Sequence, residues 1–397
     1  MLVSTIELLT RARRGKDLGI NGAENLRLDW RAVIERKDRI VASWSKGKEA
    51  APEKLGTAVL RGKGVFAGPH EIAVDGRTYS AEKIIIATGS RPARPPLPGA
   101  EIGITSDELI HLKEQPHRLV VVGGGFIGLE FGFALAWAGS KVTILQSGPQ
   151  VAPALDDEIR EILLNAAGEA GMTIVTNVKV KAIAADKTVE AEAGGAAQKF
   201  PADQVLLATG RPSNVEALRP QVAGVELDRS AVRVNEYLQS VSASHVYAVG
   251  DAAGKHQHSP VAWYEGPIAA QNALKGNDRK VDFTIFPSAI FTIPAVGQVG
   301  LTEKEALTRG LKAKVSRMPF DYNPAAGVRN ETEGMVKVVY EEGTERILGV
   351  HVIGARAEDL VQIGAAAMRG GLKKSEVGAM HYVFPTLGGA IFDAMAA

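Results

Sequence analysis

A glycine-rich turn between a strand pattern and a helix pattern is the feature that most constrains the fold. RLVVVGGG at residues 118–125 has the continuous apolar character of a buried strand that runs into glycines, whereas FIGLEFGFALAWAG at 126–139 reads as a helix. A second strand, SKVTILQ, follows at 140–146. A strand–helix–strand unit joins parallel strands, because that connection needs a crossover of about a dozen residues or more. The sequence therefore predicts an α/β fold with a parallel sheet.

The glycines of this turn predict a dinucleotide site. Gly123, Gly125 and Gly128 fit the spacing G-x-G-x-x-G, and they follow a strand and open a helix, as this fingerprint requires. In order, such glycines permit a tight turn, close approach of the backbone to a pyrophosphate, and packing of the helix on the strand. The N–H groups where the helix starts, at Phe126 and Ile127, would face the phosphates. The alternative, that the glycines only make a tight turn, is disfavoured by this context.

The end of the second strand decides which nicotinamide cofactor is preferred. An acidic residue there holds the ribose hydroxyls of NAD, whereas a nearby Arg accommodates the 2′-phosphate of NADP. Here the strand ends at the neutral Gln146, which can hydrogen-bond a hydroxyl, and Ser147 follows. The sequence leaves the choice between NAD and NADP open and predicts weak discrimination between them.

The flanking segments differ in their periodicity. Residues 1–50 have the apolar spacing of two polar-faced helices. Residues 57–90 read as short strands joined by turns, with Asp75-Gly76 as a hairpin signal. Four prolines in the segment 91–100 predict a stiff loop and a crossover between domains.

The rest of the chain, after the second strand, is expected to contain both helices and strands. A helix is expected at 156–171 and strands at 172–209, and from about Phe283 a separate α+β domain follows. The strand ending Ala-Thr-Gly occurs twice, at 87–89 and 208–210, which suggests two related halves.

Composition excludes several functions. The 397 residues include no cysteine, and 46 Lys plus Arg balance 45 Asp plus Glu to a net charge of +1. Without cysteine, disulfides, cysteine-ligated metals and a dithiol relay are excluded within this chain. Near-neutral charge gives no reason to expect nucleic acid or a membrane surface as a partner, and no apolar run reaches the roughly eighteen residues of a spanning helix. We expect a cytoplasmic protein of two or three domains without a metal site.

Several motifs together resemble the class I pyridine nucleotide-disulfide oxidoreductases, flavoproteins that include lipoamide dehydrogenase, glutathione reductase and mercuric reductase. The motifs are IIIATGSRPARPPLPG, TSDELIHLKEQPHRLVVVGGGFIGLE, VLLATGRPSN, HVYAVGDAAG and IFTIPAVGQVGLTE, in the family's order and spacing. The resemblance implies two Rossmann-like domains, the first incomplete, and an α+β dimerisation domain. It places an FAD-binding domain at 1–110 and 245–280, an NAD(P)-binding domain at 111–244 and the dimerisation domain of a homodimer at 281–397.

The resemblance also implies roles for single residues. Asp251, after Gly250, matches an aspartate that binds the ribityl and phosphate portion of FAD, and its alternative role is a helix N-cap. Glu130 matches a glutamate close to the contact between flavin and nicotinamide, and its alternative is a solvated helix residue. The other implied cofactor-binding residues are Thr88, Gly89 and Ser90 beside the FAD, Gln257, His258, Ser259 and Pro260 in the loop over the flavin, and Val180 and Gly210 along the nicotinamide cofactor.

The chain departs from the family pattern near its start. It contains one G-x-G-x-x-G, whereas the family begins with an FAD-binding βαβ unit that carries its own. MLVSTIELL resembles the sequence that directly follows the family's Cys-x4-Cys pair and Lys, so we expect Met1 to correspond to an internal position. The missing Lys would be the partner of Glu130, and a buried carboxylate without a counter-charge is costly.

The C-terminal loop departs as well. Phe384 stands where the family has an acid–base His, and Gly389 where it has a Glu, and neither side chain transfers a proton. His381 lies three residues before the position of the family's His. The catalytic candidates are therefore the phenol of Tyr382 and, elsewhere in the sequence, Glu130. This loop argues against a standard disulfide substrate.

Two functions are consistent with these observations. The first is an FAD-dependent NAD(P)H oxidoreductase that passes hydride from the nicotinamide dinucleotide to flavin and then electrons to a small acceptor of the mercuric-reductase or quinone (diaphorase) type. The alternative is a truncated, inactive homologue that binds NAD(P) but little or no FAD. The colour of the purified chain distinguishes them.

Overall fold

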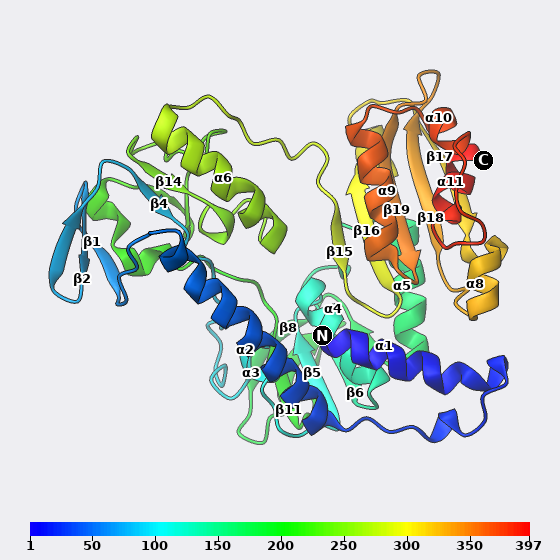
Figure 1. Ribbon diagram of the computed structural model, residues 1–397. Coiled ribbons are helices and arrows are strands. Elements are labelled where there is room, and N and C mark those ends of the chain that lie inside the picture. The colour runs from blue at the N-terminus through cyan, green and yellow to red at the C-terminus, as the bar shows by residue number, and fades with distance from the viewer. The chain divides into compact units, whose positions relative to one another are not determined.

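The computed structural model describes residues 1–397, which form two compact units (Figure 1). The first unit comprises Met1–Asp38, Arg94–Thr209 and Thr284–Ala397, and the second comprises Arg39–Ala93 and Gly210–Phe283. Each unit therefore assembles segments that lie far apart in the sequence.

The chain contains both α-helices and β-strands. The helices are α1 (Leu2–Arg13), α2 (Trp30–Lys54), α3 (Ser106–Leu109), α4 (Phe126–Trp137), α5 (Asp157–Glu169), α6 (Ser259–Lys275), α7 (Glu303–Thr308), α8 (Pro324–Arg329), α9 (Ala357–Arg369), α10 (Lys374–Gly378) and α11 (Gly389–Ala396). The strands are β1 (Gly64–Gly68), β2 (Glu71–Val74), β3 (Arg77–Ser80), β4 (Ile84–Ile86), β5 (Arg118–Val122), β6 (Lys141–Leu145), β7 (Thr173–Val175), β8 (Lys179–Ile183), β9 (Val189–Ala193), β10 (Ala196–Phe200), β11 (Gln204–Leu207), β12 (Leu227–Asp228), β13 (Ala231–Val232), β14 (Val246–Ala248), β15 (Ser288–Ile290), β16 (Ala295–Gly300), β17 (Ala313–Pro319), β18 (Met335–Glu341) and β19 (Ile347–Gly354).

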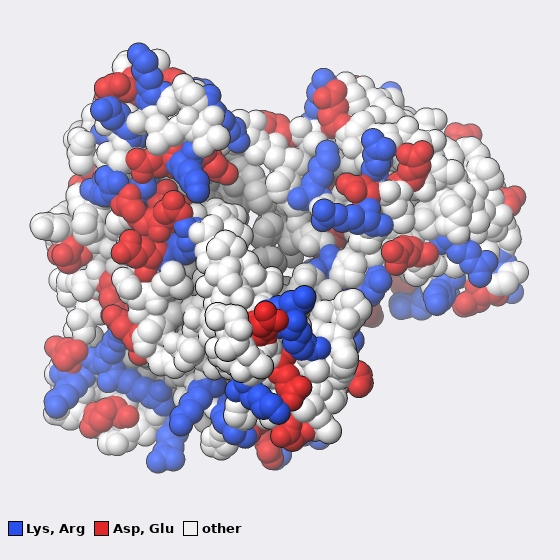
Figure 2. Space-filling view, turned by 180° about the vertical axis from the view of Figure 1, so that it is seen from behind, with Lys and Arg blue, Asp and Glu red and all other residues white.

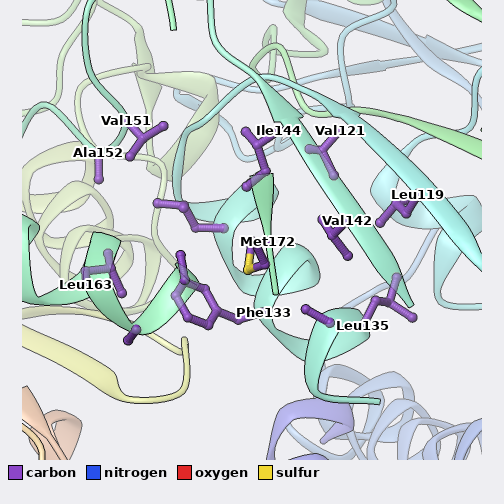
Figure 3. Close-up of a cluster of buried hydrophobic side chains, with 14 of the residues drawn as sticks. Leu119, Val121, Phe133, Leu135, Val142, Ile144, Val151, Ala152, Leu163 and Met172 are labelled. Atoms are coloured by element: carbon purple, nitrogen blue, oxygen red, sulfur yellow. The ribbon is translucent and has the colours of Figure 1, made fainter. Parts of the chain in front are cut away.

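A parallel sheet in the order β11–β5–β6–β7 lies within the first unit. Helix α4 crosses from β5 to β6, which confirms the predicted strand–helix–strand unit. Side chains of both strands and of the helix point toward one another in a buried cluster that includes Val121, Phe133 and Ile144 (Figure 3). Burial of each such side chain contributes about 1.5–3 kcal/mol relative to exposure, so this cluster fixes the helix on the sheet.

An antiparallel sheet in the order β15–β16–β19–β18–β17 occupies the C-terminal part of the first unit. Helix α9 packs on β16 and β19, where a Cβ at Gly364 would lie 2.8 Å from the side chain of Val350. The small residues of α9 thus permit close packing on the sheet, and the α+β pattern expected after Phe283 is confirmed.

The second unit contains a parallel pair of strands, β14 and β4, with α6 packed on them (Figure 1). Strand β2 pairs with β3 so that Val74 opposes Arg77, and φ is 47° at Asp75 and 82° at Gly76. Positive φ at both central residues is the geometry of a type I′ turn, which confirms the hairpin signal. Helices α1 and α2 likewise confirm the two N-terminal helices, although α2 continues to Lys54.

A buried lysine on the antiparallel sheet of the first unit binds carboxylates at the starts of helices α5 and α7. Lys337 on β18 is 2% exposed, and its Nζ donates to Asp156 Oδ1 at 3.0 Å, Glu158 Oε1 at 2.7 Å and Glu303 Oε2 at 2.8 Å. Asp156 is the N-cap of α5 and also accepts from the backbone N–H of Glu158. Arg317 donates two hydrogen bonds of 2.6 Å to Glu158. These five side chains, the Lys337 cluster, hold α5 and α7 against the antiparallel sheet.

The Lys337 cluster predicts a pH dependence of stability. Hydrogen bonds from Arg317 and Lys337 lower the pKa of Glu158 from 4.5 to about 2. Because the folded-state pKa is the lower one, the carboxylate stabilises the fold fully above pH 4.5, and this contribution is lost as the pH falls toward 2. In urea titrations, the stability difference between wild type and Glu158→Gln should be constant above about pH 5 and shrink steadily below it. An unchanged difference down to about pH 3 would contradict this assignment.

Charges of both signs cover the surface. On the face shown in Figure 2, Lys and Arg side chains are interspersed with Asp and Glu, as the balance of 46 basic and 45 acidic residues leads one to expect. None of the helices is both long and apolar enough to cross a membrane.

Candidate functional site

The glycine turn, Gly123–Gly128, connects the end of β5 to the start of α4. At Gly123 φ is 114°, and a Cβ there would lie 2.3 Å from the carbonyl oxygen of Ala208, just after β11. At Gly128 a Cβ would lie 2.1 Å from the carbonyl oxygen of Gly123. The helix start, the turn and the neighbouring strand end therefore approach one another more closely than a side chain allows.

Gly125 differs from these two glycines because it faces open space. It is the N-cap of α4, with φ −77° and ψ −176°, and a Cβ would meet no atom within 4 Å. Leu129 makes the first helical hydrogen bond, to the carbonyl oxygen of Gly125 at 3.0 Å. The N–H groups of Ile127 and Gly128 precede it and have no intrahelical carbonyl to pair with. Open space, backbone donors and the positive end of the helix dipole together suit an anionic phosphate.

The side chain of Gln146 is bound to the protein's own backbone. Its Oε1 accepts from the N–H of Gly124 at 2.9 Å, and its Nε2 donates to the carbonyl oxygen of Gln150 at 3.3 Å. The N–H of Ala152 donates to the carbonyl oxygen of Gly124 at 3.0 Å. The loop after β6 thus holds both polar groups of Gly124, and residues 146–155 include no charged side chain.

Two further turns meet in the second unit. Because β4 and β14 are parallel neighbours, their carboxyl ends place Thr88–Ser90 beside Gly250–Asp251. Ser90 Oγ donates to Asp251 Oδ2 at 2.5 Å, across 161 positions of sequence. We call this pair of turns the Ser90–Asp251 site. It brings together Thr88, Gly89, Ser90, Gly250 and Asp251, five of the residues that sequence analysis placed at an FAD.

Residues that sequence analysis did not single out complete this site. Arg211 Nε donates to Ser90 Oγ at 2.9 Å, Ser213 Oγ donates to the carbonyl oxygen of Asp251, and Asn214 Nδ2 donates to the carbonyl oxygen of Thr88 at 3.0 Å. The available signal was the repeated Ala-Thr-Gly ending, since Arg-Pro-Ser-Asn at 211–214 directly follows its second copy.

The loop before α6 joins the same site. Gln257 Nε2 donates to the carbonyl oxygen of Arg211 at 2.7 Å. His258 is the N-cap of α6, Ser259 and Pro260 form its first turn, and burial lowers the pKa of His258. The predicted loop residues therefore lie next to Arg211 and, through it, Ser90.

The remaining predicted cofactor residues lie in separate places. Val180 on β8 packs against a buried cluster that contains Val122 and Leu145, the last residues of β5 and β6. Gly210 belongs to the second unit, has φ 122°, and accepts from the N–H of Ala93 at 2.9 Å.

Both candidate catalytic side chains are engaged in hydrogen bonds. Glu130 Oε1 accepts from the N–H of Phe291 at 3.0 Å, and burial raises the pKa of its carboxyl. Tyr382 OH donates to Asp393 Oδ1 at 2.7 Å, and this hydrogen bond raises the pKa of the phenol. The ring of Tyr382 fills the space beside Gly389, where a Cβ would lie 2.9 Å from it. The catalytic roles of both residues stay predictions.

Comparison with known proteins assigns both parts of the chain. The family model described as pyridine nucleotide-disulphide oxidoreductase matches residues 12–267, and the model of that family's dimerisation domain matches residues 286–395. A mercuric reductase from Staphylococcus aureus is 36% identical over 87% of this chain and 64% of its own length. A dihydrolipoyl dehydrogenase from Bacillus subtilis is 32% identical over 99% of this chain and 87% of its own length.

Similarity to solved structures covers the whole chain. The Cu(II) complex of the HOCl-induced flavoprotein disulfide reductase RclA from Escherichia coli is similar with a TM-score of 0.88 and 26% identity, over 100% of this chain and 88% of that one. The α/β fold of Rossmann-like domains with a C-terminal antiparallel dimerisation domain is thereby confirmed. The chain spans 56% to 64% of the length of the three mercuric reductases that it matches.

Proposed function

This chain belongs to the pyridine nucleotide-disulphide oxidoreductase family, and on that premise we propose that it is an FAD-dependent NAD(P)H oxidoreductase. The observation that carries the proposal is the glycine turn, whose Gly125 faces open space at the start of α4. The resemblance noted from the motifs and the family match agree on this class of enzyme.

The glycine turn fits a nicotinamide dinucleotide. A bulky residue at position 125 would project into space that no protein atom fills, next to backbone donors of a helix start. Gly125, Phe126 and Ile127 are the residues we assign to the pyrophosphate, with Gln146 and Val180 along the rest of the cofactor. When bound, this cofactor and flavin supply hydride transfer, while the protein supplies position and electrostatics.

The Ser90–Asp251 site fits part of an FAD molecule. A partly exposed carboxylate, a hydroxyl and a guanidinium converge there, and these groups suit sugar hydroxyls and phosphate. Gly89 has φ 65°, and a Cβ there would meet no atom within 4 Å. We therefore assign Thr88–Ser90, Gly250, Asp251 and the loop from Gln257 to Pro260 to this cofactor.

We propose a small electron acceptor other than a standard disulfide. In the loop before α11, Phe384 is 68% exposed and Tyr382 occupies the space beside Gly389. The side chains assigned to the acceptor are the phenol of Tyr382, whose pKa is raised by the hydrogen bond to Asp393, and the carboxyl group of Glu130, whose pKa is raised by burial. This supports an acceptor of the mercuric-reductase or quinone type. The match to a dimerisation domain supports a homodimer.

A direct test is to purify the chain with added FAD and to follow flavin absorbance and NAD(P)H oxidation with Hg(II) and with a quinone. The proposal expects bound flavin and acceptor-dependent oxidation. The presence of only one G-x-G-x-x-G in the sequence favours a second candidate, a homologue that binds NAD(P) without FAD. A colourless protein that binds NADH but oxidises none of it would favour that candidate.

Substitution of Gly125 tests the nucleotide site separately. Its φ and ψ lie in the extended region open to any residue, so Gly125→Val should fold, with a small fall in Tm because valine is a weaker N-cap than glycine. We expect NADH affinity, measured by fluorescence titration, to fall at least about tenfold, which is about 1.4 kcal/mol. A valine variant with wild-type affinity would place the nucleotide elsewhere.

Cofactor choice should be weak. Gln146 is neutral and engaged with Gly124, and the following loop has no charge to attract or repel a 2′-phosphate. We expect kcat/KM for NADH and NADPH to differ by less than about a hundredfold, or about 2.7 kcal/mol. A larger preference in either direction, measured by steady-state kinetics, would contradict this prediction.

A further inference from the structure

Helix α6 carries a buried carboxyl group that binds the backbone of the Ser90–Asp251 site. Glu265 is 1% exposed, and its Oε2 accepts from the N–H of Gly250 at 2.6 Å. Its Oε1 is also buried and has no hydrogen-bond partner. Leaving a buried acceptor unsatisfied costs stability, so core packing alone does not explain a glutamate at this position.

The neighbourhood of Gly250 shows what this carboxyl group holds in place. Gly250 opens the 3₁₀ turn Gly250–Ala252 with φ 59°, and a Cβ there would lie 2.9 Å from the side chain of Ala262 on α6. The turn therefore lies directly on the helix. The hydrogen bond from Gly250 to Glu265 fixes the backbone one residue before Asp251.

Three polar contacts hold Asp251 and the residue before it. Ser90 donates to its carboxylate, Ser213 donates to its carbonyl oxygen, and Glu265 binds the preceding N–H. The first two contacts come from segments of the same site, whereas Glu265 reaches it from the buried face of α6. Burial raises the pKa of Glu265, and the Gly250 N–H opposes that shift by favouring the ionised form.

We propose that Glu265 is a positioning residue, which orients the Gly250–Asp251 turn so that the Asp251 carboxylate is presented to FAD. This inference rests on the proposed function, in which the Ser90–Asp251 site binds that cofactor. Glu265 itself lies behind the turn and acts through the N–H of Gly250.

The test compares three full-length variants. Glu265→Gln keeps an acceptor for the Gly250 N–H, whereas Glu265→Leu removes it. Asn272→Leu is the matched control, because Asn272 is a fully buried polar residue of the same helix that binds backbone groups of Tyr237, Asp278 and Arg279 instead of the turn. A merely structural loss in α6 should affect both leucine variants alike.

Two measurements are made on each variant: FAD affinity by flavin fluorescence titration, and hydrogen exchange of the Gly250 amide. We expect Glu265→Leu to lose at least about tenfold in FAD affinity and to exchange Gly250 rapidly. Glu265→Gln should stay within about threefold of wild type in affinity. Asn272→Leu should lower Tm but keep FAD affinity and slow exchange at Gly250.

The outcomes separate this inference from the proposed function. If wild type binds FAD and Glu265→Leu binds it equally well, or Asn272→Leu loses as much affinity, the positioning role is wrong and the function stands. If wild type binds no FAD, the flavin part of the proposed function fails and the inference fails with it. Slow exchange at Gly250 in Glu265→Leu would overturn the inference whatever the FAD result.

Discussion

Alanine in place of Gly128 is expected to weaken NADH binding strongly. A Cβ there would lie 2.1 Å from the carbonyl oxygen of Gly123, whereas real Cβ contacts essentially never fall under 3.0 Å. The turn must therefore move by about an ångström, and a misplacement of that size can cost about a hundredfold in rate. Overpacking of this kind also lowers the free energy of unfolding by about 1–3 kcal/mol.

The measurements are NADH fluorescence titration, kcat/KM with NADH, and urea unfolding. Gly168→Ala is the matched control, because Gly168 lies in α5, is exposed, and has no atom within 4 Å of its Cβ position. Alanine is favoured over glycine in a helix by about 1 kcal/mol, so this variant should be neutral or slightly more stable. A Gly128→Ala protein with wild-type stability and NADH affinity would refute the close packing described for the turn.

The parts of the fold that follow from local rules could be predicted from the sequence. The apolar strand, the glycines and the helix pattern specify the strand–helix–strand unit within residues 118–146, and all of it is observed. Asp75-Gly76 specifies its hairpin for the same reason, since its two residues must adopt positive φ. In both cases the constraint lies within a few residues of the feature that it determines.

Contacts between distant segments could not be predicted in this way. Ser90 and Asp251 meet across 161 positions, and Lys337 meets Asp156 across 181. The motifs suggested that Ser90 and Asp251 share a cofactor, but a hydrogen bond between them depends on β4 and β14 being neighbours. Lys337 reads in the sequence as an ordinary charged residue of a strand, and its burial follows only from the position of α5 and α7.

The hydrogen-bond partners of single side chains could not be predicted from the sequence either. Gln146 stays a predicted contact of the nucleotide, and the structure adds that its side-chain amide binds the backbone of Gly124 and of Gln150. Glu265 carried a signal that was overlooked, since Val261, Glu265, Ile268 and Asn272 recur at helical spacing and are all buried. A polar residue on the buried face of a helix indicates a partner inside the fold.

Removing the charge of Lys337 should destabilise the protein more than any surface substitution. Its ammonium group binds three carboxylates, and Lys337→Met would leave Asp156, which is 3% exposed, without a compensating charge. Breaking a buried ion pair by removing one partner costs about 3–5 kcal/mol, because the remaining charge cannot return to water. We therefore expect the free energy of unfolding in urea to fall by that amount, with α5 and α7 loosened from the antiparallel sheet.

Lys314→Met provides the control within the same sheet. Lys314 lies on β17 and pairs with Glu342 at 3.5 Å, with both side chains 56% exposed. Solvent-exposed pairs of this kind contribute about 0–1 kcal/mol. Lys314→Met should therefore lower the free energy of unfolding only slightly, and by still less at high salt. The Lys337 effect should persist in high salt, because water and ions do not reach a side chain that is 2% exposed. If both variants lost the same free energy of unfolding, and if both losses shrank at high salt, Lys337 would behave as an ordinary surface charge in solution.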